Sequence, residues 1–274
     1  MVTLGNIQFG GSKRFVLIAG PCAIESRDMV LSTAEALLNV CHDLDVELVF
    51  KSSFDKANRT SCSPRGVGME EGLKILQEVR TQFSLPVLTD VHESWQCKPV
   101  AEVADILQIP AFLSRQTDLI QAAALTGRVL NVKKGQFMAP WDMQGVVQKV
   151  KEVIAEPSLL LTERGSSFGY GNIVVDMTSL EEMKRIGFPV VFDATHSVQK
   201  PSSLSGVTLG NREMVPVLMR AALAVGIDGL FLEVHPDPDN AFSDAANQLR
   251  LADIAAVLRQ AIAVDEVAKQ LYFE

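Results

Sequence analysis

Charged and polar side chains recur in this sequence at the ends of short hydrophobic runs. Eight such runs end in or lead into the segments GPCAIES, KSSFDKANRTS, TDVHE, PAFLSRQTD, KKGQF, ERGSSFGYGN, DATHS and EVHPDPDNAFSD. Core packing needs none of these charges, and an unpaired buried charge is strongly unfavourable. The pattern therefore predicts that these segments converge on one site that binds charged ligands.

Cations make up the first chemical set in these segments. They are Lys51, Lys56, Arg59, Arg115, Lys133, Lys134 and Arg164. Arginine binds phosphate and carboxylate through a bidentate fork, whereas lysine acts as a point charge. Any one of them taken alone is more simply an exposed surface residue. Together, on a chain with a net charge of −8, they favour a focused site for substrates with several negative charges.

A second set offers ligands for a metal ion: Cys22, His196, Glu233 and Asp244. A thiolate, an imidazole and two carboxylates suit a divalent transition ion. These residues have no short ligand spacing, and a buried cysteine is commonly just a small hydrophobe. By pattern alone the metal site therefore competes with an ordinary packing role. His92 and Glu93 are further catalytic candidates, although Asp90 and His92 suit the orientation of neighbours equally well.

The hydrophobic runs alternate with helical patterns, which indicates the fold. The runs span residues 15–20, 46–52, 85–90, 104–109, 128–133, 158–163, 188–193 and 229–234. Between them, residues 29–44, 69–83 and 143–154 repeat apolar side chains at helical spacing. Eight strands alternating with helices predict a (β/α)₈ barrel, whose active site lies at the carboxyl ends of the strands. A doubly wound open sheet is the competing fold, but it usually binds its ligand at one switch point.

We expect a single domain over residues 1–274, since such a barrel holds roughly 250 residues. The N-terminal VTLGNIQF predicts a short hairpin that seals the amino end of the barrel. Ser26 and Asp118 are expected to be helix N-caps and Gly127 a C′ residue. Closure of the barrel would make its first, seventh and eighth strands neighbours, so the four candidate metal ligands would converge.

Composition excludes several classes of function. The net charge of −8 argues against a nucleic-acid partner, which needs clustered positive charge. The N-terminus lacks the features of a signal peptide, and no apolar run of about 18 residues predicts a membrane span. The four cysteines include no C-x-x-C pair and suggest no disulfide framework. We therefore expect a cytoplasmic protein with reduced cysteines.

The eight strand-end segments together resemble those of the 3-deoxy-D-manno-octulosonate 8-phosphate synthases, and the resemblance covers nearly the whole chain. The resemblance implies a (β/α)₈ barrel, assembled as a homotetramer with active sites near subunit interfaces. It also implies condensation of phosphoenolpyruvate with D-arabinose 5-phosphate and release of inorganic phosphate. The product supplies the Kdo sugar of lipopolysaccharide.

Two details of the resemblance narrow the assignment. The segment KANRTS contains Ala57 and Asn58 where the related heptulosonate 7-phosphate synthases typically carry a single proline. The family also divides into enzymes with Cys at the end of the first strand, which use a metal, and enzymes with Asn there, which do not. Cys22, with His196, Glu233 and Asp244 at the other ligand positions, implies the metal-dependent class. Mn, Fe, Zn, Co and Cd all remain open as the divalent ion.

The resemblance also assigns roles to single residues. Lys56, Lys133 and Arg164 would hold phosphoenolpyruvate with Arg115 nearby, and His196 would be both catalytic and a metal ligand. Asn58, Arg59 and Thr60 would hold the acceptor, with an Arg115 from a neighbouring subunit as an alternative contributor. The remaining predicted substrate-binding residues are Lys51, Gln116 and Lys134.

Three alternatives stay open at the level of sequence. The first is a heptulosonate 7-phosphate synthase, which would use erythrose 4-phosphate. A second is a non-catalytic barrel that senses sugar phosphates or serves as a scaffold. The third is a zinc hydrolase barrel, although the H-x-H pair usual after the first strand of such enzymes is absent.

Overall fold

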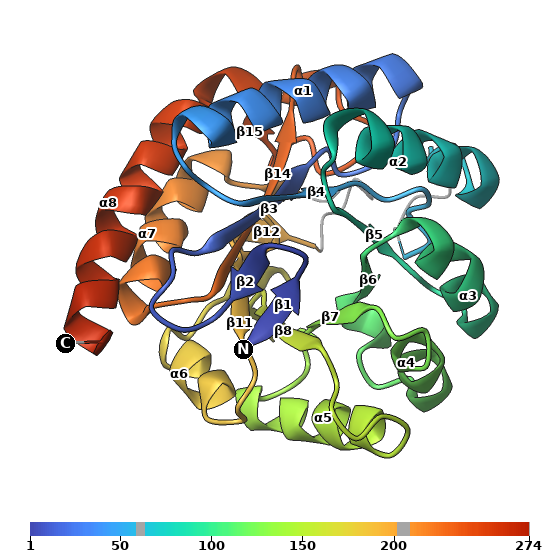
Figure 1. The fold of residues 1–274 in the computed structure, drawn as a ribbon. Helices are drawn as coiled ribbons and strands as arrows, with labels where there is room; N and C mark the ends of the chain where they lie inside the picture. Colours follow the sequence, from blue (N-terminus) through green and yellow to red (C-terminus); the bar gives the residue numbers. More distant parts are fainter. Residues whose placement is uncertain (59–63, 202–208, 274) are drawn as a thin grey trace.

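Eight parallel strands close into a barrel in the computed structural model of the protein, which describes residues 1–58, 64–201 and 209–273 (Figure 1). The strands are β3 (Val16–Gly20), β4 (Leu48–Lys51), β5 (Val87–Asp90), β6 (Ile106–Ile109), β7 (Val129–Lys133), β8 (Leu159–Glu163), β11 (Val190–Asp193) and β14 (Gly229–His235). Each pairs with the next in this order, and β14 pairs back to β3. The predicted (β/α)₈ barrel is confirmed and the open sheet is wrong.

The barrel is surrounded by eight principal helices, each of which follows a strand of the barrel. They are α1 (Arg27–Asp43), α2 (Met69–Phe83), α3 (Ser94–Val103), α4 (Thr117–Ala124), α5 (Met143–Lys151), α6 (Thr178–Lys184), α7 (Val215–Val225) and α8 (Ile254–Phe273). Helix α1 begins as predicted, because the Ser26 side chain accepts a hydrogen bond from the backbone N–H of Met29. The Asp118 cap is wrong: α4 begins at Thr117 and its N-cap is Gln116. Gly127, predicted to be the C′ residue, has a φ of 72° but lies one residue beyond the observed C′ position, since Leu125 is the C-cap.

Every residue of the eight barrel strands is buried, which explains their nearly continuous hydrophobic runs. Successive side chains alternate between the helices and the barrel interior. The interior side chains nearest the amino ends are apolar and form a compact cluster that includes Ile18, Leu88, Leu160 and Phe231. One layer further along the strands, the interior side chains become polar. The fold therefore places its charge at the carboxyl end of the barrel.

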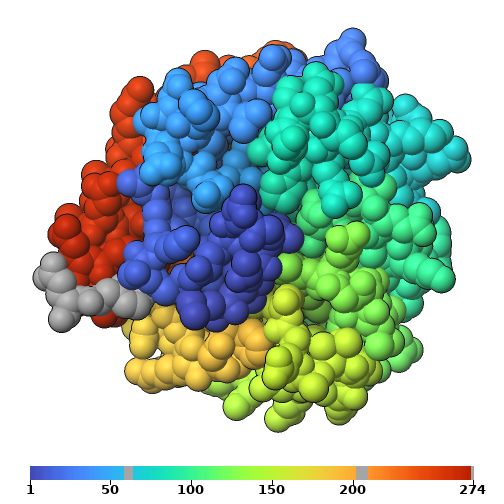
Figure 2. All heavy atoms as spheres, in the orientation of Figure 1, coloured from blue at the N-terminus to red at the C-terminus, as the bar shows by residue number. Residues whose placement is uncertain are grey.

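The predicted N-terminal hairpin is present as β1 (Val2–Leu4) and β2 (Ile7–Phe9). It lies over the centre of the amino end of the barrel, coloured dark blue in Figures 1 and 2. Val2, Ile7 and Phe9 pack against the apolar interior cluster, and Phe9 is completely buried. Since this end is closed, ligands must enter at the other.

The loops contain short strands and 3₁₀ helices. The remaining strands are β9 (Ser166–Phe168), β10 (Asn172–Val174), β12 (Gln199–Lys200), β13 (Leu209–Gly210) and β15 (Leu249–Arg250), and the 3₁₀ helices are η1 (Ala111–Leu113), η2 (Pro140–Asp142), η3 (His196–Val198), η4 (Arg212–Met214), η5 (Pro238–Asn240) and η6 (Leu251–Asp253). Within the described part of the chain, no helix combines the length and the apolar character that a membrane crossing requires.

Candidate active site

A cavity of about 270 Å³ opens at the carboxyl ends of the barrel strands. Eight of the predicted site residues line it: Lys51, Lys56, Asn58, Lys133, Arg164, His196, Glu233 and Asp244. Its wall also contains Asp90, His92, Gln108, Gln136 and Gln199. The residues come from the ends of strands that are far apart in sequence, which is the arrangement expected of a barrel active site.

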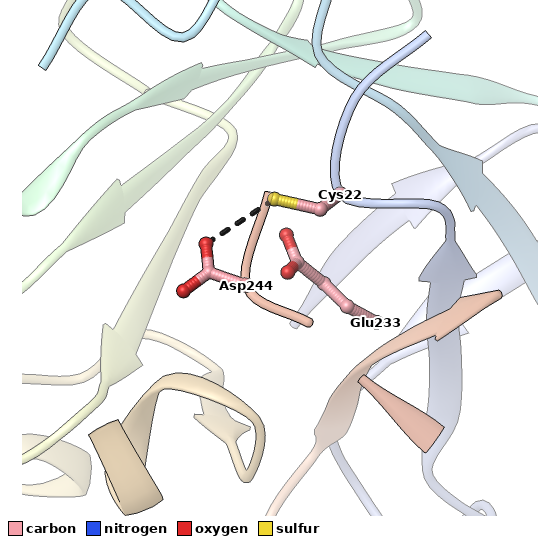
Figure 3. A group of neighbouring side chains, drawn as sticks. All are labelled: Cys22, Glu233 and Asp244. Carbon is pink, nitrogen blue, oxygen red and sulfur yellow. Dashed lines mark hydrogen bonds between the residues drawn. The ribbon is translucent and has the colours of Figure 1, made fainter. Parts of the chain in front are cut away.

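Cys22, Glu233 and Asp244 form one corner of this site (Figure 3). One ligand atom from each lies within 4.8 Å of the other two, and Cys22 Sγ is 3.3 Å from Asp244 Oδ2. Cys22 follows strand β3, at whose end Gly20 lies directly against β4: a Cβ there would be 2.0 Å from the carbonyl oxygen of Lys51. Only glycine allows the two strands to approach so closely at this point.

Asp244 reaches the corner from the loop after β14, with a backbone φ of 50°. Aspartate is among the few residues that tolerate this left-handed region, and such strain clusters at functional sites. The turn is held by the carbonyl oxygen of Asp244, which accepts hydrogen bonds from the N–H groups of Asn247 and Gln248. Its side chain is oriented by Gln199, whose Nε2 donates to Asp244 Oδ1 over 2.6 Å.

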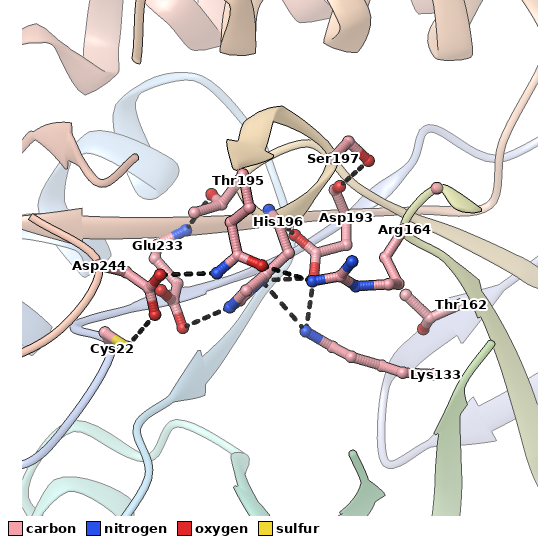
Figure 4. A network of polar contacts seen from close by, with 12 residues as sticks. Cys22, Lys133, Thr162, Arg164, Asp193, Thr195, His196, Ser197, Glu233 and Asp244 are labelled. Atoms are coloured by element: carbon pink, nitrogen blue, oxygen red, sulfur yellow. Dashed lines mark hydrogen bonds and ion pairs between the residues drawn. The ribbon is translucent and has the colours of Figure 1, made fainter. Parts of the chain in front are cut away.

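His196 stands beside the corner with one ring nitrogen already engaged (Figure 4). Nδ1 lies 2.6 Å from Asp193 Oδ2, and a carboxylate can only accept, so Nδ1 carries the proton. Nε2 therefore presents its lone pair, and it lies 3.6 Å from Glu233 Oε1. A carboxylate behind a histidine is the usual support for a metal-ligating imidazole. The tertiary structure thus brings His196 next to the three-residue group.

The four residues fit a divalent metal ion. Glu233 Oε2 is buried and has no hydrogen-bond partner among the described residues, so this carboxylate has an unused acceptor in the corner. Burial alone would raise the pKa of Glu233, but the charges of the neighbouring cations, Lys51 first and Lys56 with it, outweigh burial and hold that pKa well below its ordinary value. Burial and the charge of Glu233 raise the pKa of the Cys22 thiol. A cation is the partner that would both occupy Oε2 and stabilise the thiolate.

The anion-binding side of the cavity is built from the cations. Arg164, which is 4% exposed, donates from Nη2 to Gln199 Oε1 over 2.5 Å, while its Nη1 is buried without a hydrogen-bond partner among the described residues. Lys133 pairs with Asp193, and burial lowers its pKa from the ordinary value. Lys56 Nζ lies 3.8 Å from Glu233 Oε1. An anionic ligand in the cavity would supply the acceptor that Arg164 Nη1 lacks among the described residues.

Three predicted substrate-binding residues do not line this cavity. Lys134 is 1% exposed, and its Nζ donates to Met138 O, Gly165 O and Ser166 Oγ at 3.0–3.3 Å. Arg115 and Gln116 are exposed on the loop after β6, and Arg115 lines a separate cavity that also contains Asp142 and Lys149. Arg59 and Thr60 lie outside the described residues.

Other residues of the site escaped the sequence analysis. Gln199 contacts both Arg164 and Asp244, and Gln248 Oε1 accepts the N–H of Cys22 over 3.0 Å. An uncharged glutamine in a loop carries no signal that separates it from any other surface residue. Asp193 did carry one, because it is a carboxylate at the end of a predicted strand.

The chain is similar to known proteins over nearly its whole length. The sequence profile of the DAHP synthetase I family matches residues 1–270. Curated proteins named 2-dehydro-3-deoxyphosphooctonate aldolase are similar over nearly their full length. The one from Fusobacterium nucleatum is 56% identical over 98% of this chain and 96% of its own. The one from Synechococcus is 60% identical, over 97% and 93%. The one from Geobacter sulfurreducens is 54% identical, over 98% of both.

Proposed function

This chain belongs to the DAHP synthetase I family, and we propose that within it the protein is a metal-dependent 2-dehydro-3-deoxyphosphooctonate aldolase. The proposed reaction condenses phosphoenolpyruvate with D-arabinose 5-phosphate and water, and yields 3-deoxy-D-manno-octulosonate 8-phosphate and inorganic phosphate. Relatives that bear this name at 51–60% identity support the assignment.

In the described part of the chain, Nη1 of the buried Arg164 side chain has no hydrogen-bond partner, and this observation carries the proposal. Phosphoenolpyruvate and a pentose phosphate together bring about five negative charges into the site at neutral pH. Lys51, Lys56, Lys133 and Arg164 all face the same cavity. A guanidinium with a free buried donor suits a phosphate or carboxylate, to which it can bind through its planar fork.

The side chains of this protein promote the reaction mainly by orienting its two substrates. Lys56, Lys133 and Arg164 hold phosphoenolpyruvate with its methylene carbon toward the aldehyde of the acceptor. Asn58, which lines the cavity, contributes to holding the acceptor. Such orientation of two reactants is worth several kcal/mol, out of a maximum of about 7–11 kcal/mol. Asp193 keeps the Nδ1 proton on His196 and so fixes which nitrogen faces the reacting atoms.

The Cys22 corner supports a role for a divalent metal ion. Cys22, His196, Glu233 and Asp244 would hold it. When bound, such an ion supplies Lewis acidity, which polarises an aldehyde or acidifies a water molecule. A metal site with a cysteine ligand requires a free thiol, and Cys22 is free. This supports our proposal of a reducing, cytoplasmic location.

We also propose a homotetramer with active sites near subunit interfaces. The loops after β6, β7 and β8 expose large apolar side chains, namely Phe112, Phe137, Trp141, Phe168 and Tyr170. Exposed apolar side chains gathered at one rim suit contact with another protein surface. Arg115 lies on the same set of loops but outside the central cavity, so in an oligomer it would face a neighbouring subunit.

Phosphate release on mixing phosphoenolpyruvate with arabinose 5-phosphate tests the function. We expect release with this acceptor, much slower release with erythrose 4-phosphate, and loss of activity in excess dipicolinate that the divalent ion restores. Preference for erythrose 4-phosphate would make the chain a heptulosonate synthase. Absence of release with either acceptor would favour a sensor or scaffold, and full activity in chelator would refute the metal-dependent class.

A further inference from the structure

Beneath the cavity, polar side chains from four neighbouring strands form one continuous hydrogen-bonded chain. Thr162 Oγ1 on β8 donates to Asn131 Oδ1 on β7 over 2.6 Å. Asn131 Nδ2 donates to Gln108 Oε1 on β6 over 2.8 Å. Gln108 Nε2 in turn donates to Asp90 Oδ1 on β5. All four residues are buried.

The register of the barrel explains why these side chains meet. Asp90 is directly opposite Gln108, and Gln108 is directly opposite Asn131. Residues in register share a face of the sheet, and here that face is the barrel interior. A slip by one residue would turn such a side chain toward the helices. Thr162 is opposite Lys133 and reaches Asn131 diagonally across the same sheet. The hydrogen-bonded chain therefore joins strand residues only, with no contribution from loops.

The hydrogen bonds from Thr162 to Asp90 can run in only one direction, and Asp90 sets it. An ionised carboxylate only accepts hydrogen bonds, so Gln108 must present its NH₂ group to Asp90. The Oε1 of Gln108 then faces Asn131 and requires a donor, which fixes the Asn131 amide as well. Thr162 supplies the last donor. Aligned in this way, each hydrogen bond polarises the next.

A second, shorter chain reaches Asp90 from the opposite side. Lys56 Nζ donates to Ser53 Oγ over 3.0 Å, and Ser53 Oγ donates to Asp90 Oδ2. Burial alone would raise the pKa of Asp90, but Lys51 and Lys56 outweigh it and hold that pKa well below its ordinary value. Asp90 is thus the acceptor on which both chains converge.

The residues of the two hydrogen-bonded chains differ in whether they line the cavity. Lys56, Asp90 and Gln108 line the cavity, whereas Asn131 and Thr162 do not. We propose that Asn131 and Thr162 are positioning residues for the anion site, because they orient the Gln108 amide toward Asp90, which through Ser53 holds Lys56 in place. The inference rests on the proposed function, in which Lys56 binds phosphoenolpyruvate.

Loss of the Thr162 hydroxyl would disturb this arrangement at its far end. Asn131 Oδ1 would be buried without a donor, and a half-satisfied buried network is unfavourable. The two amides are then free to turn, and a turned Gln108 would direct its Oε1 at the Asp90 carboxylate. Asp90 would move away from that oxygen, and Lys56 would lose its fixed position.

A graded series at Thr162 tests the proposal, with valine, cysteine and serine in place of threonine. Valine keeps the shape but removes the donor, a cysteine S–H is a weak donor, and serine keeps the hydroxyl. Thr89→Val is the matched control. Thr89 is also completely buried in a strand of the barrel, but its Oγ1 has no hydrogen-bond partner among the described residues. Calorimetric binding of phosphoenolpyruvate, steady-state KM and kcat, and the thermal midpoint are measured for each, with the same divalent ion.

We expect Thr162→Val to raise the dissociation constant and KM for phosphoenolpyruvate about tenfold, the effect of one net buried hydrogen bond, with a smaller change in kcat. Thr162→Ser should bind within about threefold of wild type, Thr162→Cys should fall between, and Thr89→Val should match wild type.

The outcomes separate this proposal from the function on which it rests. Equal affinity across the folded Thr162 variants would overturn the positioning role, even if their thermal midpoints differ. If the valine variant does not fold, equal affinity of the serine and cysteine variants does the same. A wild-type protein that neither binds phosphoenolpyruvate nor releases phosphate overturns both.

Discussion

Lys51 Nζ donates a hydrogen bond to Glu233 Oε1 over 2.8 Å, in a pair whose side chains are 1% and 0% exposed. Glu233 also belongs to the group with Cys22 and Asp244. The same carboxylate therefore borders both the anion-binding cations and the candidate metal corner. Water does not solvate either charge of this buried pair. A substitution at Glu233 should therefore affect both the anion-binding cations and the candidate metal corner.

Glu233→Gln should weaken binding of the divalent ion by more than about 100-fold, the upper range reported for changes to residues behind a ligand. The physical reason is the loss of a negative ligand whose Oε2 has no hydrogen-bond partner among the residues that the structure describes. Competition against a chromophoric chelator measures the affinity. Glu70→Gln, an isosteric change on the exposed face of α2, is the control. Unchanged affinity in the Glu233 variant would exclude Glu233 as a ligand.

Gln199→Met should weaken both divalent-ion and phosphoenolpyruvate binding, each by about tenfold or more, since it removes hydrogen bonds to two charged groups. Gln199 contacts Arg164 on one side and Asp244 on the other. Gln248→Met is the comparison, because Gln248 contacts the N–H of Cys22 and should affect the metal ion alone. The two affinities are measured separately by titration. A Gln199 variant in which only one of the two affinities changes would show that Gln199 does not couple the metal corner to the anion-binding side of the cavity.

Lys134→Met should lower the thermal midpoint by about 5 °C, which corresponds to roughly 2 kcal/mol in a chain of this size. Lys134 holds the loops after β7 and β8 together through Met138 O, Gly165 O and Ser166 Oγ. Lys133→Met, in the adjacent residue that lines the cavity, should instead act mainly on phosphoenolpyruvate affinity. Calorimetry and thermal unfolding distinguish the two. An equally large loss of affinity in both variants would support the substrate-binding role that the sequence predicts for Lys134.

Asp265 makes stability depend on pH. Burial raises its pKa above the ordinary value, so the folded state binds its proton more tightly than the unfolded state does. The contribution of the protonated form is complete below about pH 4 and is lost as the pH rises through the folded pKa. Asp265→Asn mimics the protonated form, so its thermal midpoint relative to wild type should rise with pH above about 4. Asp43→Asn, at the exposed end of α1, is the control, and a difference that does not change with pH would contradict the prediction.

Phe168→Glu combined with Tyr170→Glu should dissociate the proposed tetramer into smaller species. These side chains are 71% and 97% exposed in the single chain, and a charge at a buried contact is costly. Light scattering after size exclusion gives the mass. Leu271→Glu, on the equally exposed end of α8 (79%), should leave the mass of the assembly unchanged. A wild-type protein that elutes as a monomer would refute the assembly directly.

The sequence by itself determined the barrel and the general place of its chemistry. Strand and helix periodicities are local, so the eight strands, the N-terminal hairpin and the cap at Ser26 were predictable from neighbouring residues. Strand ends were the positions of the predicted site residues, and the parallel barrel brings such ends together at one face. That is why the sequence alone predicts most of the cavity's cations and all four candidate metal ligands.

Only the tertiary structure decided which of these side chains share the cavity. Lys133 and Lys134 are adjacent and chemically identical, yet the pleat turns one into the barrel and the other toward the loops. Arg115 has the same charge as Arg164 but lies outside the central cavity. The Gln199 bridge and the chain from Thr162 to Asp90 join residues that are tens of positions apart. Such contacts depend on barrel register and loop closure, which no local pattern encodes.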